Sequence, residues 1–456
     1  MTSIKIFAPI CFSKEIEYTL SFIFDNKDYD IFYNFSENHK NIILDFGRFK
    51  LESSIDFFED YYKYRRSFTA NIKKLNVIEY GLNCEFEDDF LPIFFGNEII
   101  ELSNTRAILN FDFFGTIFFF LSGYDELFIS NRDSHGRVSA FDTTIYKSGC
   151  VQRPIVDEYI FFLFTILNKI GIISDKISRV GKVIYTCDVD YPFDESINSF
   201  KRFFYEIVKD VFIRVNFILL LKRFVNVFLY HLNIHLLDPY YSFQRILEIC
   251  KKYHCDMEFF FIVDNYQNPI NGNYQLDNKV AKIIRRVLSF GGRIGVHGSY
   301  NSYKSLDLIL SEKSKFELFL KSQNINFKIS SIRQHYLQID YSCTMPLFIK
   351  AGYVSDFTGG FADYPGFRFG TSKPFYMWDH SNLSKTTLLQ RPLILMEATL
   401  FAKRYLNLNY DKKVLNEVLK LKINCLKYGG DFIFLWHNSH FNSKKDFDFF
   451  ENILSN

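Results

Sequence analysis

Two carboxylates follow an apolar run in the segment Lys182-Val-Ile-Tyr-Thr-Cys-Asp188-Val-Asp190-Tyr191-Pro192. Residues 183–185 of this segment are typical of a buried β-strand. Residues i and i+2 of a strand share a face, so Asp188 and Asp190 can point to the same place. Two ionised carboxylates at such a short distance repel each other unless a cation or a proton lies between them. The segment therefore predicts either a site at the end of a strand or an acidic, solvated turn.

Runs typical of strands and runs typical of helices alternate from residue 182 onward. The predicted strands cover residues 182–185, 257–263, 293–296, 328–333, 353–357, 393–396 and 432–436. Helical patterns lie between several of them, as in proteins whose parallel strands are joined by helices. About seven such strands would nearly close a barrel. We therefore expect the α/β fold class, with a parallel sheet, open or closed into a barrel, over residues 179–456.

The chain of 456 residues is longer than one hydrophobic core usually supports, so a second domain is expected. Short apolar runs alternate with polar turns up to residue 110, and two apolar runs, 114–121 and 160–170, are typical of helices. We predict an α/β N-terminal domain, with one or two subdomains, over residues 1–178.

Composition and charge exclude some classes of partner. The chain has 54 basic and 52 acidic residues, which provide no electrostatic footprint for nucleic acid. Its eight cysteines are scattered without a Cys-x-x-Cys pair, which favours reduced thiols, and the N-terminus lacks the pattern of a signal peptide. We expect a cytoplasmic protein with no nucleic-acid partner.

The most apolar part of the chain covers residues 211–237. Arg214, Lys222 and Arg223 interrupt it, and its longest run without charge, 224–237, is too short to span a bilayer. We therefore expect no transmembrane segment and interpret this part as a buried or amphipathic helix. Peripheral contact with a membrane stays open as an alternative.

Four more polar clusters occur where predicted strands end. They contain His297 with Asn301, Arg333 with His335 and Tyr336, Asp356 with Thr358, and Trp436 with His437 and His440. Any one of them alone is more often structural than functional, and His440 is expected to be structural or solvent-exposed. Several such strand ends in one domain are much harder to explain as independent turns.

These residue types suit metal-assisted hydrolysis of an amide or an ester. Carboxylates and imidazoles are good ligands for zinc or a similar divalent ion, which lowers the pKa of bound water towards about 7. A second carboxylate can accept the proton of that water, and an imidazole can donate a proton to a leaving amine. An arginine beside the base would keep it ionised and oriented.

The order of these motifs resembles that of the polysaccharide deacetylases, the carbohydrate esterase family 4 or NodB-homology enzymes. The matching motifs, within residues 180–445, are Thr-x-Asp188-x-Asp190, His297-x-Ser-x-x, Arg333-x-x-Tyr336 and Leu435-x-His437. The chain is similar to a bacterial branch found in surface-polysaccharide loci, such as those for lipopolysaccharide or O-antigen. Residues 112–159 resemble an N-terminal domain that is fused to such enzymes.

The resemblance implies a distorted barrel that binds one divalent metal, with zinc as the first choice, at the C-terminal ends of its strands. It also implies a role for each motif residue. These are Asp188 as general base, Asp190 and His297 as metal ligands, Arg333 as the residue that orients the base, the backbone N–H of Tyr336 as oxyanion donor and His437 as general acid.

The chain departs from the family at one metal ligand. The usual motif is His-Ser/Thr-x-x-His, and its second histidine is Asn301 here. An amide oxygen is a poorer zinc ligand than an imidazole. His335, which stands where the family usually has proline, is the alternative ligand, and water is another. Loss of the metal also stays open.

Three further residues are candidates for a supporting role. Arg368 lies in a Gly-bounded loop and could contact an acidic sugar or a phosphate, or only order its own loop. Trp436 could stack on a sugar ring or pack in the core. Glu397 follows a predicted strand and could contact and orient a metal-binding or catalytic side chain.

We predict from these features a metal-dependent hydrolase that removes an N-acetyl or N-formyl group from a sugar. The sugar would belong to a bacterial surface polysaccharide or to its precursor, which could be lipid-linked. One alternative is a non-hydrolytic glycan-binding protein on the same barrel with an impaired metal site. Another is a glycosyltransferase that holds a metal–nucleotide at Asp188 and Asp190, but it leaves Arg333 and His437 without a natural role.

Overall fold

The computed structural model describes most of the chain between Thr2 and Ser455. The residues outside the description are 1, 25–28, 70, 85, 87–88, 174–178, 195, 197–198, 214, 233, 235–236, 264–268, 273 and 456. Residues 174–178, on which the predicted domain boundary falls, are among these. No helix in the described part is both long and apolar enough to cross a membrane.

The chain divides into two compact units. Unit 1 comprises Met1–Gly181, Gly366–Pro392 and Asn424–Gly430, and unit 2 comprises Lys182–Pro365, Leu393–Ile423 and Asp431–Asn456. The loop that carries Arg368 therefore belongs to unit 1, whereas all the predicted catalytic and metal-binding residues belong to unit 2.

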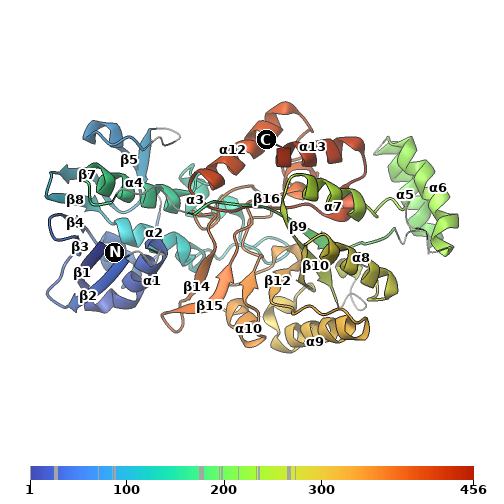
Figure 1. Ribbon diagram of the computed structural model, residues 1–456, viewed down its shortest axis with the longest axis horizontal. Coiled ribbons are helices and arrows are strands. Elements are labelled where there is room, and N and C mark those ends of the chain that lie inside the picture. The colour runs from blue at the N-terminus through green and yellow to red at the C-terminus, as the bar shows by residue number, and fades with distance from the viewer. Residues whose placement is uncertain are drawn as a thin grey trace. The chain divides into compact units, whose positions relative to one another are not determined.

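Unit 1 is built around a mixed sheet of six strands in the order β2-β1-β3-β4-β8-β7 (Figure 1). These strands are β1 (Thr2–Pro9), β2 (Tyr29–Ser36), β3 (Ile42–Asp45), β4 (Lys50–Ser53), β7 (Gly96–Leu102) and β8 (Arg106–Phe111). Two antiparallel pairs accompany the sheet, β5 (Lys73–Asn76) with β6 (Phe90–Ile93) and β14 (Phe375–Asp379) with β15 (Ser384–Gln390). The helices are α1 (Ser13–Ile23), α2 (Phe113–Leu121), α3 (Thr144–Lys147) and α4 (Ile155–Lys169).

Asp112 has a structural role at the start of α2. Its carboxylate accepts hydrogen bonds from the backbone N–H groups of Gly115, at 2.6 Å, and Phe57, at 3.0 Å. A Cβ on Gly115 would lie 2.2 Å from this carboxylate, so the close cap requires glycine. The Asp112-Phe-Phe-Gly115 motif thus caps the helix and fixes it to a neighbouring segment.

Unit 2 contains seven parallel strands that are adjacent in the order β13-β12-β11-β10-β9-β17-β16. They are β9 (Val183–Val189), β10 (Asp256–Ile262), β11 (Arg293–Gly298), β12 (Ser331–Gln334), β13 (Ser355–Asp356), β16 (Leu395–Met396) and β17 (Phe432–Leu435). Each overlaps one of the seven predicted strands, and the mixed α/β class is confirmed. All six pairings among these strands are parallel.

The helices after residue 199 include α8 and α9, which pack on β11. They are α5 (Phe200–Phe212), α6 (Phe217–His231), α7 (Phe243–Lys252), α8 (Asn278–Ser289), α9 (Leu306–Ser322), α10 (Thr344–Lys350), α11 (Glu397–Phe401), α12 (Lys412–Lys427) and α13 (Lys444–Ser455). The apolar part that was expected to be one helix forms two, α5 and α6, with a break between them.

Closure of the seven strands into a barrel stays a prediction. No strand pairing among the described residues joins β13 to β16. The segments next to these strands do meet, because the N–H of Leu393 donates to the carbonyl of Gly359 at 3.0 Å. Ile184, Phe260 and Ile433 share one buried core cluster with Leu393. The parallel order has a firm consequence, since it brings the carboxyl ends of β9, β10, β11, β12 and β17 to one edge.

Candidate active site

The predicted motif residues of unit 2 meet at this carboxyl edge. Asp188 is the second-last residue of β9, and Asp190 is the first residue after the strand. His297 on β11 is paired in register with Arg333 on β12. His437 lies two residues beyond the end of β17. Residues that are up to 249 positions apart in sequence thus share one small region, as the recurrence of polar strand ends predicted.

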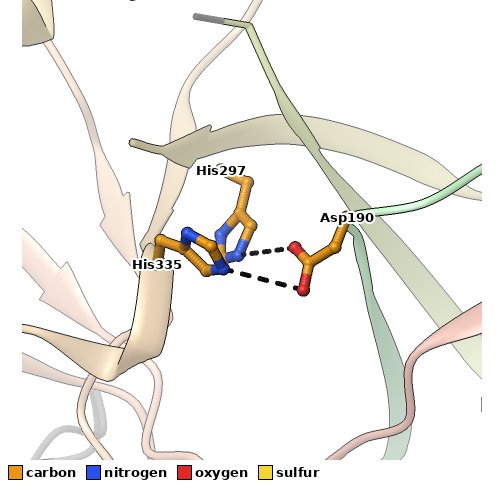
Figure 2. A group of neighbouring side chains, drawn as sticks. All are labelled: Asp190, His297 and His335. Carbon is orange, nitrogen blue, oxygen red and sulfur yellow. Dashed lines mark ion pairs between the residues drawn. The ribbon is translucent and has the colours of Figure 1, made fainter. Parts of the chain in front are cut away.

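Asp190, His297 and His335 form the centre of the site (Figure 2). One candidate ligand atom from each residue lies within 4.8 Å of the others. The Nε2 atom of His297 is 3.4 Å from Oδ1 of Asp190, and the Nε2 atom of His335 is 3.7 Å from Oδ2. Figure 2 shows both rings directed at the carboxylate of Asp190.

Hydrogen bonds determine which nitrogen of His297 is free to bind an ion. Nδ1 of His297 is 2.9 Å from the backbone carbonyl oxygen of Arg333, which can only accept, so Nδ1–H donates. In the neutral ring, Nε2 therefore carries a lone pair, which points at Asp190. This backbone contact is the usual way in which proteins orient a metal-binding histidine.

The same reasoning applies to His335. Its Nδ1 atom is 3.1 Å from Oδ1 of Asn271, and that Oδ1 also accepts the N–H of Tyr300 at 2.7 Å. The second contact identifies the atom as the amide oxygen, so Nδ1–H of His335 donates to it. The Nε2 lone pair of His335 is then directed at Asp190, as in His297.

The arrangement fits a divalent cation. Oδ1 of Asp190 and Nε2 of His297 are buried and have no hydrogen-bond partner, although they lie side by side. A carboxylate oxygen that faces an imidazole lone pair is repelled unless a cation or a proton lies between them. Burial alone would raise the pKa of Asp190, but His335, His297 and His437 together lower it well below its usual range. The carboxylate is thus ionised, as a metal ligand must be.

Asp188 is held by Arg333. The guanidinium donates from Nη1 to Oδ1 of Asp188 at 3.0 Å and to the hydroxyl of Thr186 at 2.8 Å. Its Nε–H donates to the carbonyl of Phe357 at 3.0 Å, and its planar group lies 4.8 Å from the ring centroid of Phe260. Arg333 is completely buried, so it orients Asp188 rigidly.

His437 also lies beside Asp190 and is paired with Glu397. Nδ1 of His437 is 2.6 Å from Oε1 of Glu397, and Nε2 is 3.6 Å from Oδ2 of Asp190. Burial lowers the pKa of His437, but the carboxylate of Glu397 outweighs it and raises the pKa to about 10. Burial also raises the pKa of Glu397, while His437 and His440 bring it below the usual range. His437 is therefore a protonated imidazolium in the metal-free protein.

The pairing with Glu397 should make the stability of the metal-free protein depend on pH. Since the folded-state pKa of His437, about 10, exceeds its ordinary value of 6.5, the stabilisation is complete below pH 6.5. It is lost as the pH rises through the folded-state value. We expect Glu397→Gln to remove this loss, as measured by urea unfolding across that pH range. An equally steep fall in both proteins would contradict the pairing.

Asn301 lies three residues beyond the end of β11. It is exposed, and its backbone has a φ of 70°, which precedes the short helix η8 (Ser302–Lys304). Its N–H donates to the side-chain oxygen of Gln338 at 3.0 Å. Of the two protein ligands considered from the sequence, His335 lies in the cluster with Asp190 and His297, and Asn301 as a ligand stays a prediction.

The other predicted contact residues lie in three different environments. Tyr336 follows His335 with a φ of 58°, a strained conformation for this residue type that turns the chain at the site. Trp436 is 1% exposed and its ring stacks on Phe441, so it packs in the core and presents no face to a sugar. Arg368 forms an ion pair with Glu126 at 2.6 Å within unit 1, so it orders its own loop.

Two features of the site were not predicted. Asn271 orients His335 from a segment with no recognisable motif, and its contact depends on the folded chain. His440 is exposed, as expected, but the contact of its Nδ1 atom with Oε1 of Glu397, at 2.6 Å, was not predicted. Its spacing of three residues from His437 was the available signal. The structure also brings Glu397 directly behind His437, as its place after a strand indicated.

Comparisons with known proteins were made for the whole chain. A protein-family model described as a family of unknown function, DUF7033, matches residues 4–171, within unit 1. No curated protein matches the chain.

Two solved structures are similar in backbone trace. One, described provisionally as a polysaccharide deacetylase from Mycobacterium smegmatis, has 14% identity and a TM-score of 0.39, covering 62% of this chain and 85% of that one. The other is described provisionally as a polysaccharide deacetylase involved in O-antigen biosynthesis, from Bordetella bronchiseptica. It has 12% identity and a TM-score of 0.28, covering 58% of this chain and 74% of that one.

Proposed function

We propose that this protein is a metal-dependent hydrolase that removes an N-acetyl or N-formyl group from a sugar of a surface polysaccharide or its precursor. The proposal rests on one observation. The carboxylate of Asp190 lies in a buried position where the Nε2 lone pairs of His297 and His335 both point at it. Asp188, 3.6 Å from His297, and His437, 3.6 Å from Asp190, would supply a base and an acid. A glycan-binding protein without catalysis would have no use for this pair.

Asp190, His297 and His335 would hold the divalent metal, with zinc favoured by two imidazoles and a carboxylate. When bound, the ion would polarise the amide carbonyl and lower the pKa of a water molecule in the site. This assignment makes His335, rather than Asn301, the third protein ligand. It is supported by the tautomer that Asn271 imposes on His335.

The chain's own groups would move the protons. Asp188, held in place by the hydrogen bond from Arg333, would accept the proton of the water that attacks the amide carbon. His437, kept protonated by Glu397, would donate a proton to the nitrogen as the C–N bond breaks. The N–H of Tyr336 would donate to the developing oxyanion. The products would be a carboxylic acid and a free amino sugar.

The choice of a carbohydrate substrate is supported by the order of the motifs around Asp188, His297, Arg333 and His437. A cytoplasmic location is supported by the eight cysteines, none of which forms a disulfide in the structure. The proposal includes closure of the seven strands into a distorted barrel, for which the hydrogen bond from Leu393 to Gly359 is the structural support.

Removal of the metal tests the proposed function. We expect the zinc-loaded protein to release acetate from N-acetylated oligosaccharides, because the water and the amide need the ion for activation. A chelator should abolish the release, and added zinc should restore it. A matched chemical control is an O-methyl glycoside without an acyl group. Purified protein that binds no divalent ion, or an acetate release unaffected by chelation, would refute the proposal.

A further inference from the structure

Helices α5 and α6 expose large apolar side chains. The exposed fraction is 84% for Phe200, 77% for Phe212, 76% for Phe228, 72% for Ile218 and 67% for Phe217. Water-soluble proteins rarely leave so many neighbouring large apolar groups uncovered. The two helices pack against each other and form a hairpin of residues 200–231, the α5–α6 hairpin.

The interior of the α5–α6 hairpin is polar. Arg223 on α6 is completely buried, and its Nε donates to Asp210 on α5 at 2.8 Å. Its Nη1 forms an ion pair with the buried Asp194, and Asn226 donates to the buried Asp238 at 3.2 Å. In most water-soluble proteins the apolar side chains are buried and the charged ones are exposed, whereas this hairpin has charged groups inside and apolar side chains outside. This arrangement of side chains is suited to a surface that is in contact with lipid.

The charges at the surface of the hairpin have one sign. Lys201, Arg202 and Lys222 are exposed, whereas the acidic side chains of these helices, Glu206 and Asp210, face Arg223. Exposed aromatic side chains flanked by basic ones are typical of helices that lie in the interface of an anionic membrane.

We propose that the α5–α6 hairpin docks this protein on the surface of a bilayer that contains anionic lipids. The apolar side chains would enter the boundary between headgroups and acyl chains, and the basic ones would contact the lipid phosphates. A second copy of the chain fits less well, because a symmetric contact would bring Lys201 and Lys222 of both copies together, and like charges repel each other.

The hairpin is connected directly to the candidate active site. The segment that contains it leaves the site at Tyr191 and returns at Tyr240, and the side-chain amide of Asn438 donates to both carbonyls, at 2.8 and 2.9 Å. Asn438 is the residue after the proposed acid, His437. Docking would therefore tether the site to the membrane through both ends of this segment, which, if the proposed function holds, favours a lipid-linked sugar as substrate.

Vesicle binding tests the docking without reference to activity. We expect the full-length protein to sediment with vesicles of phosphatidylglycerol and phosphatidylcholine, and to bind vesicles of phosphatidylcholine alone more weakly. The triple variant Phe212→Ser, Phe217→Ser, Phe228→Ser and the double variant Lys201→Glu, Lys222→Glu should each weaken the binding at least about 10-fold. High salt should weaken the binding of the wild type.

Matched controls lie on α9, where Leu318 is 65% exposed and Lys321 is also exposed. Leu318→Ser and Lys321→Glu should leave vesicle binding unchanged, and all variants should keep the circular dichroism of the wild type. Binding that is equal in the hairpin variants and the wild type would overturn the proposal. So would a wild-type dimer, measured by light scattering, that the triple variant converts to monomers without any vesicle binding.

Discussion

Asp188→Asn should lower the turnover of the metal-loaded protein about 10²–10⁴-fold, which is the usual contribution of a positioned general base. The amide cannot accept the proton of the attacking water, although it fills nearly the same volume. The hydrogen bond of Arg333 to Oδ1 can persist, so the fold around the site should remain. The measurement is acetate release at saturating zinc, with the bound metal quantified in the same samples.

The metal content of Asp188→Asn separates two roles for this carboxylate. Oδ2 of Asp188 is 3.6 Å from Nε2 of His297, close enough that it could also reach an ion at the centre. A base that is not a ligand predicts full metal content with little turnover. Loss of both would make Asp188 a ligand, and unchanged turnover would exclude it from catalysis. Asp256→Asn, an exposed carboxylate on β10 that pairs with Lys182, is the matched control.

The sequence predicted the parts of the fold and site that depend on local pattern. Apolar runs bounded by turns identified all seven strands of unit 2, and the i and i+2 spacing placed Asp188 and Asp190 at one strand end. The convergence of His297, Arg333 and His437 followed because parallel strands share a carboxyl edge. These predictions needed only short-range periodicity and one topological rule.

The features that were not predictable depend on long-range contacts. Nothing near Asn301 indicates that its backbone turns with a positive φ and leaves the side chain exposed. The ion pair of Arg368 with Glu126 joins residues 242 positions apart, and it places that loop in unit 1. The buried pairing of Arg223 inside an apolar-faced hairpin likewise cannot be read from a hydrophobic run alone.

The position of His335 in the cluster predicts that its substitution will strongly reduce the affinity of the protein for the metal. We expect His335→Ala to lose the stoichiometric metal, because one of three protein ligands disappears and the cluster keeps only Asp190 and His297. Asn271→Ala should weaken binding about 10–100-fold, since it removes the group that orients His335. Both effects can be measured by titration with zinc in competition with a chromophoric chelator.

Asn301→Gly is the decisive control for this assignment. Glycine adopts the φ of 70° at this position without strain, so the substitution removes the amide oxygen and leaves the backbone in place. If His335 is the ligand, Asn301→Gly should bind zinc as the wild type does, and His335→Ala should not. The opposite result would return the third ligand to Asn301, where the family motif has its histidine. Loss of binding in both variants would mean that the two residues act on the same ion, and that the loop of Asn301 moves inward when the metal binds.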